Sequence, residues 1–131
     1  MFVAKHNNNS TGKIGENHAC EFIIKSGGTI LFRNYRRKSD EIDIIALSSD
    51  KTLVFCEVKA LFIKDLSPLD ALRPEDNMTV AKLRKISRTC EFFTRKYPHL
   101  IDPEKGWRID LFAIDLYGDG KAKDIRHYKN I

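Results

Sequence analysis

The sequence of 131 residues contains no long hydrophobic run, because its longest uncharged apolar runs, such as residues 53–56, have four residues. A helix that crosses a membrane needs about 20 mostly apolar residues, so no segment here is predicted to cross one. The first residues turn polar before an apolar stretch of about seven residues can form, as a cleaved export signal would require. We therefore expect a cytoplasmic protein without a membrane partner.

Cysteine is also scarce, and its spacing is unsuited to pairing. Cys20, Cys56 and Cys90 are an odd number, lie more than thirty residues apart and form no C-x-x-C motif. This pattern argues against disulfides, redox chemistry and a structural zinc site. We expect three reduced, packed thiols.

Acidic residues are fewer than basic ones. The 18 Asp and Glu residues stand against 23 Lys and Arg residues, which gives a net charge of +5 and a pI near 9.2. This balance favours a polyanionic partner such as nucleic acid, although a modest surplus of lysine is also an ordinary solubility feature. The length fits a single domain, and the 42% of hydrophobic residues can build its core.

The N-terminal part is predicted to contain a lead-in and a helix. Three consecutive asparagines at residues 7–9 favour turns, so residues 1–10 are expected to be flexible and to precede a single domain over residues 11–131. Small and apolar side chains share one helical face over residues 11–26, and a pair of glycines ends that helix.

A β-hairpin follows a short apolar run and a basic stretch. Residues 41–47 and 52–59 are rich in β-branched and aliphatic side chains and are joined by the turn-forming Ser48-Ser49-Asp50. One expected face carries Ile42, Ile44, Ala46, Val54, Cys56 and Val58, and the other is apolar as well. A sheet that is apolar on both faces must be covered on both, so we expect helices on each side.

The rest of the chain completes an α/β pattern. Its predicted elements are a long loop over residues 60–78, a helix over residues 80–97, and strands over residues 107–116 and 121–128. The order predicts an α/β sandwich with a mixed central sheet flanked by helices.

Three residues of the hairpin could carry chemistry. Glu57 and Lys59 share a face because side chains alternate along a strand, and Asp43 joins them if the register places it opposite Glu57. Two carboxylates beside a lysine can hold a divalent cation such as Mg²⁺. An ordinary salt bridge at a strand end is the competing interpretation.

Glu16 also has two interpretations. An acidic residue near the start of a helix can simply favour the positive end of the helix dipole. Its position on the predicted helix could equally direct it over the end of the sheet, toward the two carboxylates.

The order of these motifs resembles the YraN-like family, small bacterial proteins regarded as endonucleases. That family is similar to the archaeal Holliday-junction resolvases and to the PD-(D/E)xK nuclease superfamily. The resemblance covers roughly residues 12–128. The residues that carry it are Gly15-Glu16, Arg33 to Arg36, Glu41 to Ala46, Leu53 to Lys59, a Lys- and Arg-bearing helix, and Arg108-Ile109-Asp110.

The resemblance implies a restriction-endonuclease-like three-layer sandwich and a metal-dependent active site. Asp43 and Glu57 would be ligands of Mg²⁺ or Mn²⁺, Lys59 the catalytic lysine and Glu16 a further catalytic acid. Three features depart from the family pattern: Asp40 replaces Gly, Ala60-Leu61 replaces Thr-Arg, and the predicted loop over residues 60–78 is net acidic.

We therefore predict a magnesium-dependent endonuclease that hydrolyses phosphodiester bonds in DNA, including branched or single-stranded DNA, and that could act as a homodimer. The alternative is a non-catalytic module that keeps this fold and binds nucleic acid or a protein partner. Phosphate contacts are expected from basic residues before the first hairpin strand and on the helix over residues 80–97, although such a helix face is often only solvated. These residues are Arg33, Arg36, Arg37, Lys38, Lys85 and Arg88.

Overall fold

The computed structural model of the chain describes residues 2–63 and 73–131, with side chains from residue 11 onward. Its elements, in chain order, are α1 (Phe2–Lys25), β1 (Thr29–Arg37), β2 (Asp40–Leu47), β3 (Leu53–Phe62), the 3-10 turn η1 (Pro74–Asn77), α2 (Val80–Lys96), the 3-10 turn η2 (Pro98–Leu100), β4 (Trp107–Leu116) and β5 (Ala122–Tyr128). They form a mixed α/β fold.

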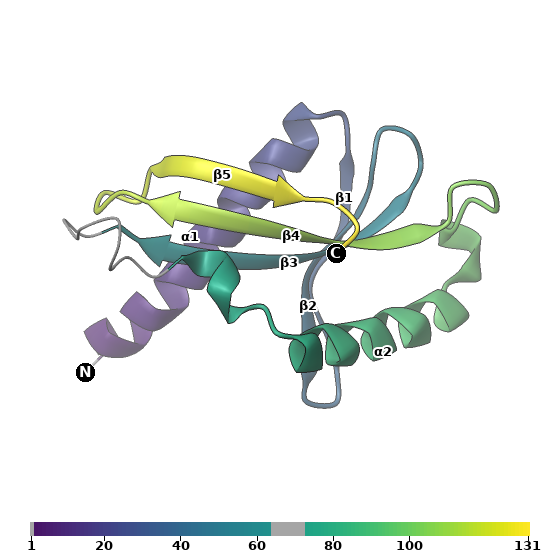
Figure 1. Cartoon of the computed structure of the whole chain (residues 1–131), viewed down its shortest axis with the longest axis horizontal. Coiled ribbons are helices and arrows are strands. Elements are labelled where there is room, and N and C mark those ends of the chain that lie inside the picture. Colours follow the sequence, from purple (N-terminus) through teal and green to yellow (C-terminus); the bar gives the residue numbers. More distant parts are fainter. Residues whose placement is uncertain (1, 64–72) are drawn as a thin grey trace.

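The five strands form one sheet in the order β1-β2-β3-β4-β5. Strands β3 and β4 are parallel, whereas the other neighbours are antiparallel, so the expected mixed sheet is confirmed. Figure 1 shows β1 and β2 running across the direction of β3, β4 and β5, with α1 passing behind the sheet. No helix in the described part of the chain combines the length and apolar character needed to cross a membrane.

Helix α1 is longer than predicted. It begins at Phe2, so the irregular structure expected for residues 2–10 is wrong. Once a helix has formed, each added residue costs little, and the turn preference of the asparagines is too weak to end it. The predicted end is confirmed, because Gly27 takes a positive φ of 89° and Gly28 N–H bonds to the carbonyl of Ile23.

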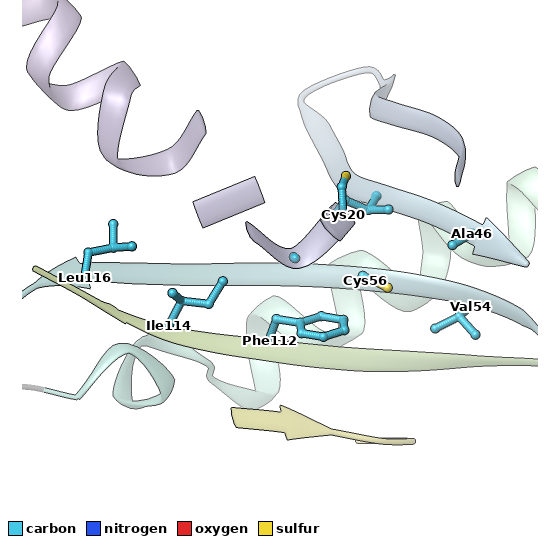
Figure 2. Packing of buried hydrophobic residues seen from close by; sticks show 9 residues of the cluster. Cys20, Ala46, Val54, Cys56, Phe112, Ile114 and Leu116 are labelled. Carbon is cyan, nitrogen blue, oxygen red and sulfur yellow. The ribbon is translucent and has the colours of Figure 1, made fainter. Parts of the chain in front are cut away.

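The sheet separates two hydrophobic clusters, as expected for a sheet covered on both faces. Ala19 and Cys20 of α1 pack on one face, and Figure 2 shows this cluster along β3 and β4. Phe93 of α2 packs on the opposite face. The three cysteines are buried and free, as predicted.

The alternation predicted for β2 is wrong at one position. Ile44 packs in the α1 cluster, but Ile42 packs in the α2 cluster together with Ile45. Two side chains that are two residues apart therefore point to opposite faces, which regular pleating does not allow. The left-handed backbone of Asn34, with a φ of 53°, lies opposite this point in the ladder.

The region predicted as a loop over residues 60–78 is partly ordered structure. Strand β3 continues to Phe62, where it is paired with Leu116 of β4, because the parallel neighbour extends the ladder. The 3-10 turn η1 lies within the same range, and residues 64–72 are outside the described residues.

Candidate active site

The candidate site lies where β2 and β3 separate. Their ladder runs from Leu47↔Leu53 to Ile44↔Cys56, so the next positions outward are Asp43 and Glu57. The register expected from the hairpin is therefore confirmed. Beyond this point, the backbone N–H of Val58 donates to Asp43 Oδ2 at 2.8 Å. The carboxylate of Asp43 thus accepts a hydrogen bond that a backbone carbonyl of β2 would accept in a regular ladder.

Asp43 connects the two faces of the sheet. Val58 belongs to the α1 side, whereas Glu57 alternates to the α2 side, where its charge is felt by the buried Cys90 thiol. Burial, followed by the hydrogen bond and the charge of Glu57, raises the pKa of Asp43 well above its ordinary range. Two carboxyls in contact without a cation favour the protonated form of one of them.

Glu16 reaches this point because α1 lies unusually close to β3. A Cβ added at Gly15 would lie 2.6 Å from the Cβ of Ala60, so a larger residue would push the helix away. Glu16 lies in the middle of α1, far from the helix start, so the helix-dipole interpretation does not apply. Burial and the charge of Asp43 raise its pKa, although hydrogen bonds from Asn34 and Arg33 oppose the rise.

Glu41 is a member of the acidic cluster that the sequence analysis missed. One carboxylate oxygen from each of Glu16, Glu41 and Asp43 lies within 4.8 Å of the other two. Glu57 contacts Asp43 but is not part of this triple. The sequence does contain a signal for Glu41, because Glu41 lies two residues before Asp43 on the same strand. The alternation of side chains along a strand does not, however, place Glu16 of α1 beside these two acids.

Asn34 links two of these acids. Its Nδ2 donates to Glu16 Oε1 at 3.0 Å and to Glu41 Oε1 at 3.2 Å. The backbone of Asn34 has a φ of 53°, a left-handed conformation that asparagine tolerates better than most residues, and the neighbouring pairs in the ladder place it opposite Asp43. The amide thus supplies two donors between carboxylates that would otherwise repel each other.

Lys59 completes the predicted group. Its Nζ lies 3.9 Å from Glu57 Oε2, and the two side chains are 25% and 13% exposed. This distance is at the limit of an ion pair, so the amine is held near the acids without being tightly bound. The geometry accommodates both the catalytic and the salt-bridge interpretation of this pair.

The basic residues of β1 and of the turn after it have different surroundings. Arg33 and Arg36 point toward the acids: Arg33 Nη2 lies 3.5 Å from Glu16, and Arg36 Nη2 lies 2.9 Å from Glu41. Arg36 is 75% exposed, so this second pair is weakly held. Lys38 lies exposed in the turn between β1 and β2.

Arg37 joins β1 to α2. Its guanidinium lies 4.1 Å above the ring of Phe92, which is 38% exposed. Lys85, Arg88 and Phe92 are spaced by three and four residues, so they share one face of α2. The described part of the chain therefore presents a basic surface made of Arg37, Lys85 and Arg88.

The acidity predicted for residues 60–78 is partly neutralised. Glu75 receives two hydrogen bonds from Arg126, at 2.7 and 2.9 Å, and one from the Tyr128 hydroxyl at 2.7 Å. These contacts, led by Arg126, lower the pKa of Glu75 to about 2. This acid therefore serves to hold η1 on β5.

These features define a mixed α/β domain with an acidic cluster at the point where two strands of its sheet diverge. The chain belongs to the family described as Uncharacterised protein family UPF0102, which matches residues 15–114. It is 41% identical over 103 residues to a UPF0102 protein of Campylobacter concisus, with 79% of this chain and 81% of the relative covered. It is 40% identical over 119 residues to one of Chlorobium phaeobacteroides, with coverage of 90% and 86%.

Proposed function

We propose that this protein is a metal-dependent endonuclease of the PD-(D/E)xK type that hydrolyses phosphodiester bonds in DNA in the cytoplasm, with a restriction-endonuclease-like arrangement of sheet and helices. The observation that carries the proposal is the meeting of four carboxylates beside one lysine. Glu16, Glu41 and Asp43 are within 4.8 Å of one another, and Asp43 contacts Glu57 next to Lys59.

The residues present fit a hard divalent cation. Carboxylate oxygens are the donors that Mg²⁺ and Mn²⁺ prefer, and Mg²⁺ usually takes only one or two of them besides water and substrate phosphate. Burial, and after it the neighbouring carboxylates, raise the pKa values of Asp43 and Glu16, as expected where acids are brought together without a cation. The ligands would be Asp43 with Glu57, or Asp43 with Glu16 and Glu41.

A bound Mg²⁺ would supply an activated water and would stabilise negative charge on the phosphate. The protein's own groups have separate tasks. Lys59 can donate a hydrogen bond to the attacking water or to the charged phosphate oxygens. Glu57, whose Oε2 lies 3.9 Å from Lys59 Nζ, keeps the amine near the site. Asn34 holds Glu16 and Glu41 in position through its amide.

DNA contact is assigned to the surface made of Arg37, Lys85 and Arg88. Contacts between such residues and phosphates position a nucleic acid without reading its sequence. The surface lies on the α2 side, which is also the side to which Glu57 and Lys59 alternate on β3. A strand bound along α2 would therefore pass near the lysine.

A non-catalytic module is the second candidate, and one observation favours it. Glu41 and Glu16 are already partnered by Arg36, Arg33 and the amide of Asn34. An acidic cluster whose negative charge is neutralised by ion pairs and hydrogen bonds within the protein can contribute to stability alone. In that case DNA or a protein partner would bind without being cleaved.

Cleavage of plasmid, single-stranded, flapped and four-way-junction DNA with Mg²⁺ or Mn²⁺ tests the proposal. We expect metal-dependent nicking of at least one substrate, its loss in chelator, and its loss in Asp43→Asn protein prepared in the same way. Asp119→Asn, in the exposed turn before β5, is the matched control for removal of one aspartate charge. Metal-independent binding without cleavage of any substrate would favour the non-catalytic module.

A further inference from the structure

A cavity of about 320 Å³ lies away from the acidic cluster, at the C-terminal end of α1. It is open to solvent on one side and is lined by Phe22 and Ile23 of α1, the turn between β2 and β3, the start of β4 and the end of β5. Glu16 precedes Phe22 by six residues, which corresponds to about 9 Å along a helix. Cys56 of the buried α1 cluster lines the cavity, whereas Glu16, Glu41, Asp43 and Glu57 do not.

A buried aspartate organises the polar wall of this cavity. Asp110 is fully buried, its Oδ1 accepts from Arg108 Nε at 2.9 Å, and its Oδ2 lies 2.7 Å from His127 Nε2. Asp110 Oδ1 also accepts the backbone N–H of Asn130 at 3.0 Å. One carboxylate thus fixes an arginine, a histidine and the C-terminal segment around the cavity.

The cavity wall retains positive charge after this pairing. Arg108 donates Nε to Asp110, and among residues 11–63 and 73–131 it forms no ion pair with a second acid. Lys129 also lines the cavity and forms no ion pair with the residues that the structure describes. Two cations and a histidine face one anion, so the wall has an excess of positive charge.

The remaining wall is mostly apolar, apart from Ser26, Ser48 and Ser49. Phe22 packs edge-on against Phe112 with ring centroids 5.5 Å apart, and His127 stacks on Phe112 at 4.2 Å. Ala46 and Val54 line the same space. Small-molecule sites combine mostly apolar walls with a few convergent polar groups, and their volumes begin at about 300 Å³.

We infer that this cavity binds a phosphate monoester attached to an apolar or aromatic group, as in a nucleoside monophosphate. A doubly charged phosphate matches the guanidinium of Arg108 and the ammonium of Lys129, because charge-assisted hydrogen bonds to phosphate are strong and arginine suits its geometry. The apolar wall accepts the ring. The inference does not rest on the proposed nuclease function, since none of the acids of that site lines the cavity.

Calorimetric titration of the full chain with thymidine 5′-monophosphate, in chelator and at fixed ionic strength, tests this inference. We expect the monophosphate to bind at least about tenfold more tightly than thymidine, because the nucleoside lacks the charged group. Equal affinity for the two, or no binding of the monophosphate, would overturn the inference. Chelator prevents metal-dependent cleavage, so the result is independent of nuclease activity.

A matched pair of lysine variants separates the cavity from general surface charge. Lys129→Gln is expected to weaken binding of the monophosphate about threefold to tenfold, whereas Lys123→Gln, on β5 and outside the cavity, should leave it unchanged. Equal weakening by both variants would contradict the inference. Ser49 at the cavity wall offers a second pair, since Ser49→Glu should weaken binding more than the neutral Ser49→Gln.

The same phosphate could come from a free nucleotide or from the end of a nucleic-acid strand. Short oligonucleotides with a 5′-phosphate and with a 5′-hydroxyl distinguish these sources. A preference for the phosphorylated strand that Lys129→Gln removes would identify a strand end as the ligand. Binding of the free monophosphate alone would identify a small nucleotide, and binding of neither would refute the site.

Discussion

Two aspartates of the same sheet, Asp43 on β2 and Asp110 on β4, behave in opposite ways. Asp43 and Asp110 are both largely removed from water, and burial by itself opposes the ionised form of each. Asp43 meets another carboxyl, Glu57, and its pKa is raised. Asp110 meets His127, Arg108 and a backbone N–H, and these hydrogen bonds outweigh burial and lower its pKa.

The comparison shows that burial raises the pKa of both acids, and that their partners decide whether this rise is reinforced or outweighed. The negative charge of Asp110 is neutralised within the protein by Arg108 and by hydrogen bonds from His127 and the backbone of Asn130. Asp110 therefore connects β4, β5 and the C-terminal segment. The negative charge of Asp43 is only partly stabilised, by the hydrogen bond from the N–H of Val58. Its environment improves when a cation arrives, which is a property expected of a metal ligand.

The largest expected effect comes from removing the charge of each aspartate in turn. Asp110→Asn should lower the free energy of unfolding by about 3 kcal/mol, because it leaves Arg108 without its anion. Asp43→Asn, measured in chelator, should raise it by about 1 kcal/mol, because it relieves repulsion between carboxyls. Urea unfolding of both variants gives the two signs. Destabilisation by both would mean that Asp43 is a structural salt-bridge residue.

Catalytic variants sharpen the comparison at the acidic cluster. Asp43→Ala and Glu57→Ala should abolish cleavage, and Lys59→Ala should reduce it about 100-fold or more, while DNA binding changes little. Gel assays of nicking and of binding, made on the same preparations, separate the two effects. Unchanged cleavage in all three variants would reject the assignment of the site.

Metal-dependent melting tells which acids hold the cation. A ligand that binds only the folded protein stabilises it by about 2.7 kcal/mol at a hundredfold excess over Kd, so Mn²⁺ should raise the melting temperature of the wild type. Glu41→Gln should reduce this rise if the triple found in the structure binds the ion. A rise that only Glu57→Gln reduces would assign the ion to Asp43 and Glu57 instead.

The pH dependence of stability should carry the sign of the raised pKa of Asp43. In chelator the unfolded chain releases this proton near the ordinary value of 3.8, whereas the folded protein keeps it to higher pH. The contribution of Asp43 to stability is therefore largest at low pH and is lost as pH rises through the folded pKa. Unfolding measured from pH 4 upward should show a steeper decline for the wild type than for Asp43→Asn. Parallel curves would contradict the raised pKa.

The smallest expected effect concerns the basic surface. Lys85→Glu with Arg88→Glu should weaken DNA binding uniformly across sequences and lower the slope of log affinity against log salt by about 0.9 for each lost phosphate contact with duplex DNA. Lys121→Glu with Lys123→Glu, two exposed residues outside α2, is the control for the same change of total charge. Titrations at several salt concentrations give the slopes. An unchanged slope would mean that the lysine and arginine residues of this surface are only solvated and do not contact phosphates.

The parts of the fold that depend on local pattern were predictable. Residues 107–116 alternate over the extent of β4, and the apolar spacing after residue 80 gives α2 almost to its last residue. The register that places Asp43 beside Glu57 followed from the length of the turn between two strands. The start of α1 was not predictable from its asparagines, since helix extension depends on the segment already formed.

The candidate site was predictable only in part for the same reason. Asp43, Glu57 and Lys59 lie on one hairpin, so strand geometry brings them together. Glu41 looked like an ordinary residue at the start of a strand, and Asn34 like a polar residue in a basic stretch. Their roles appear only when the left-handed backbone at Asn34 turns its amide between Glu16 and Glu41.

The sequence by itself determined the order of elements, the two apolar faces of the hairpin, the unpaired cysteines and the pairing of Asp43 with Glu57, because these depend on side-chain periods and on short connections. Tertiary structure alone decided that Glu16 joins the acids, since Gly15 must lie against Ala60 for α1 to approach β3 closely enough. It also decided the opposite states of Asp43 and Asp110. A carboxyl takes its pKa from groups that are distant in the chain and close in space, and only packing brings those groups to it.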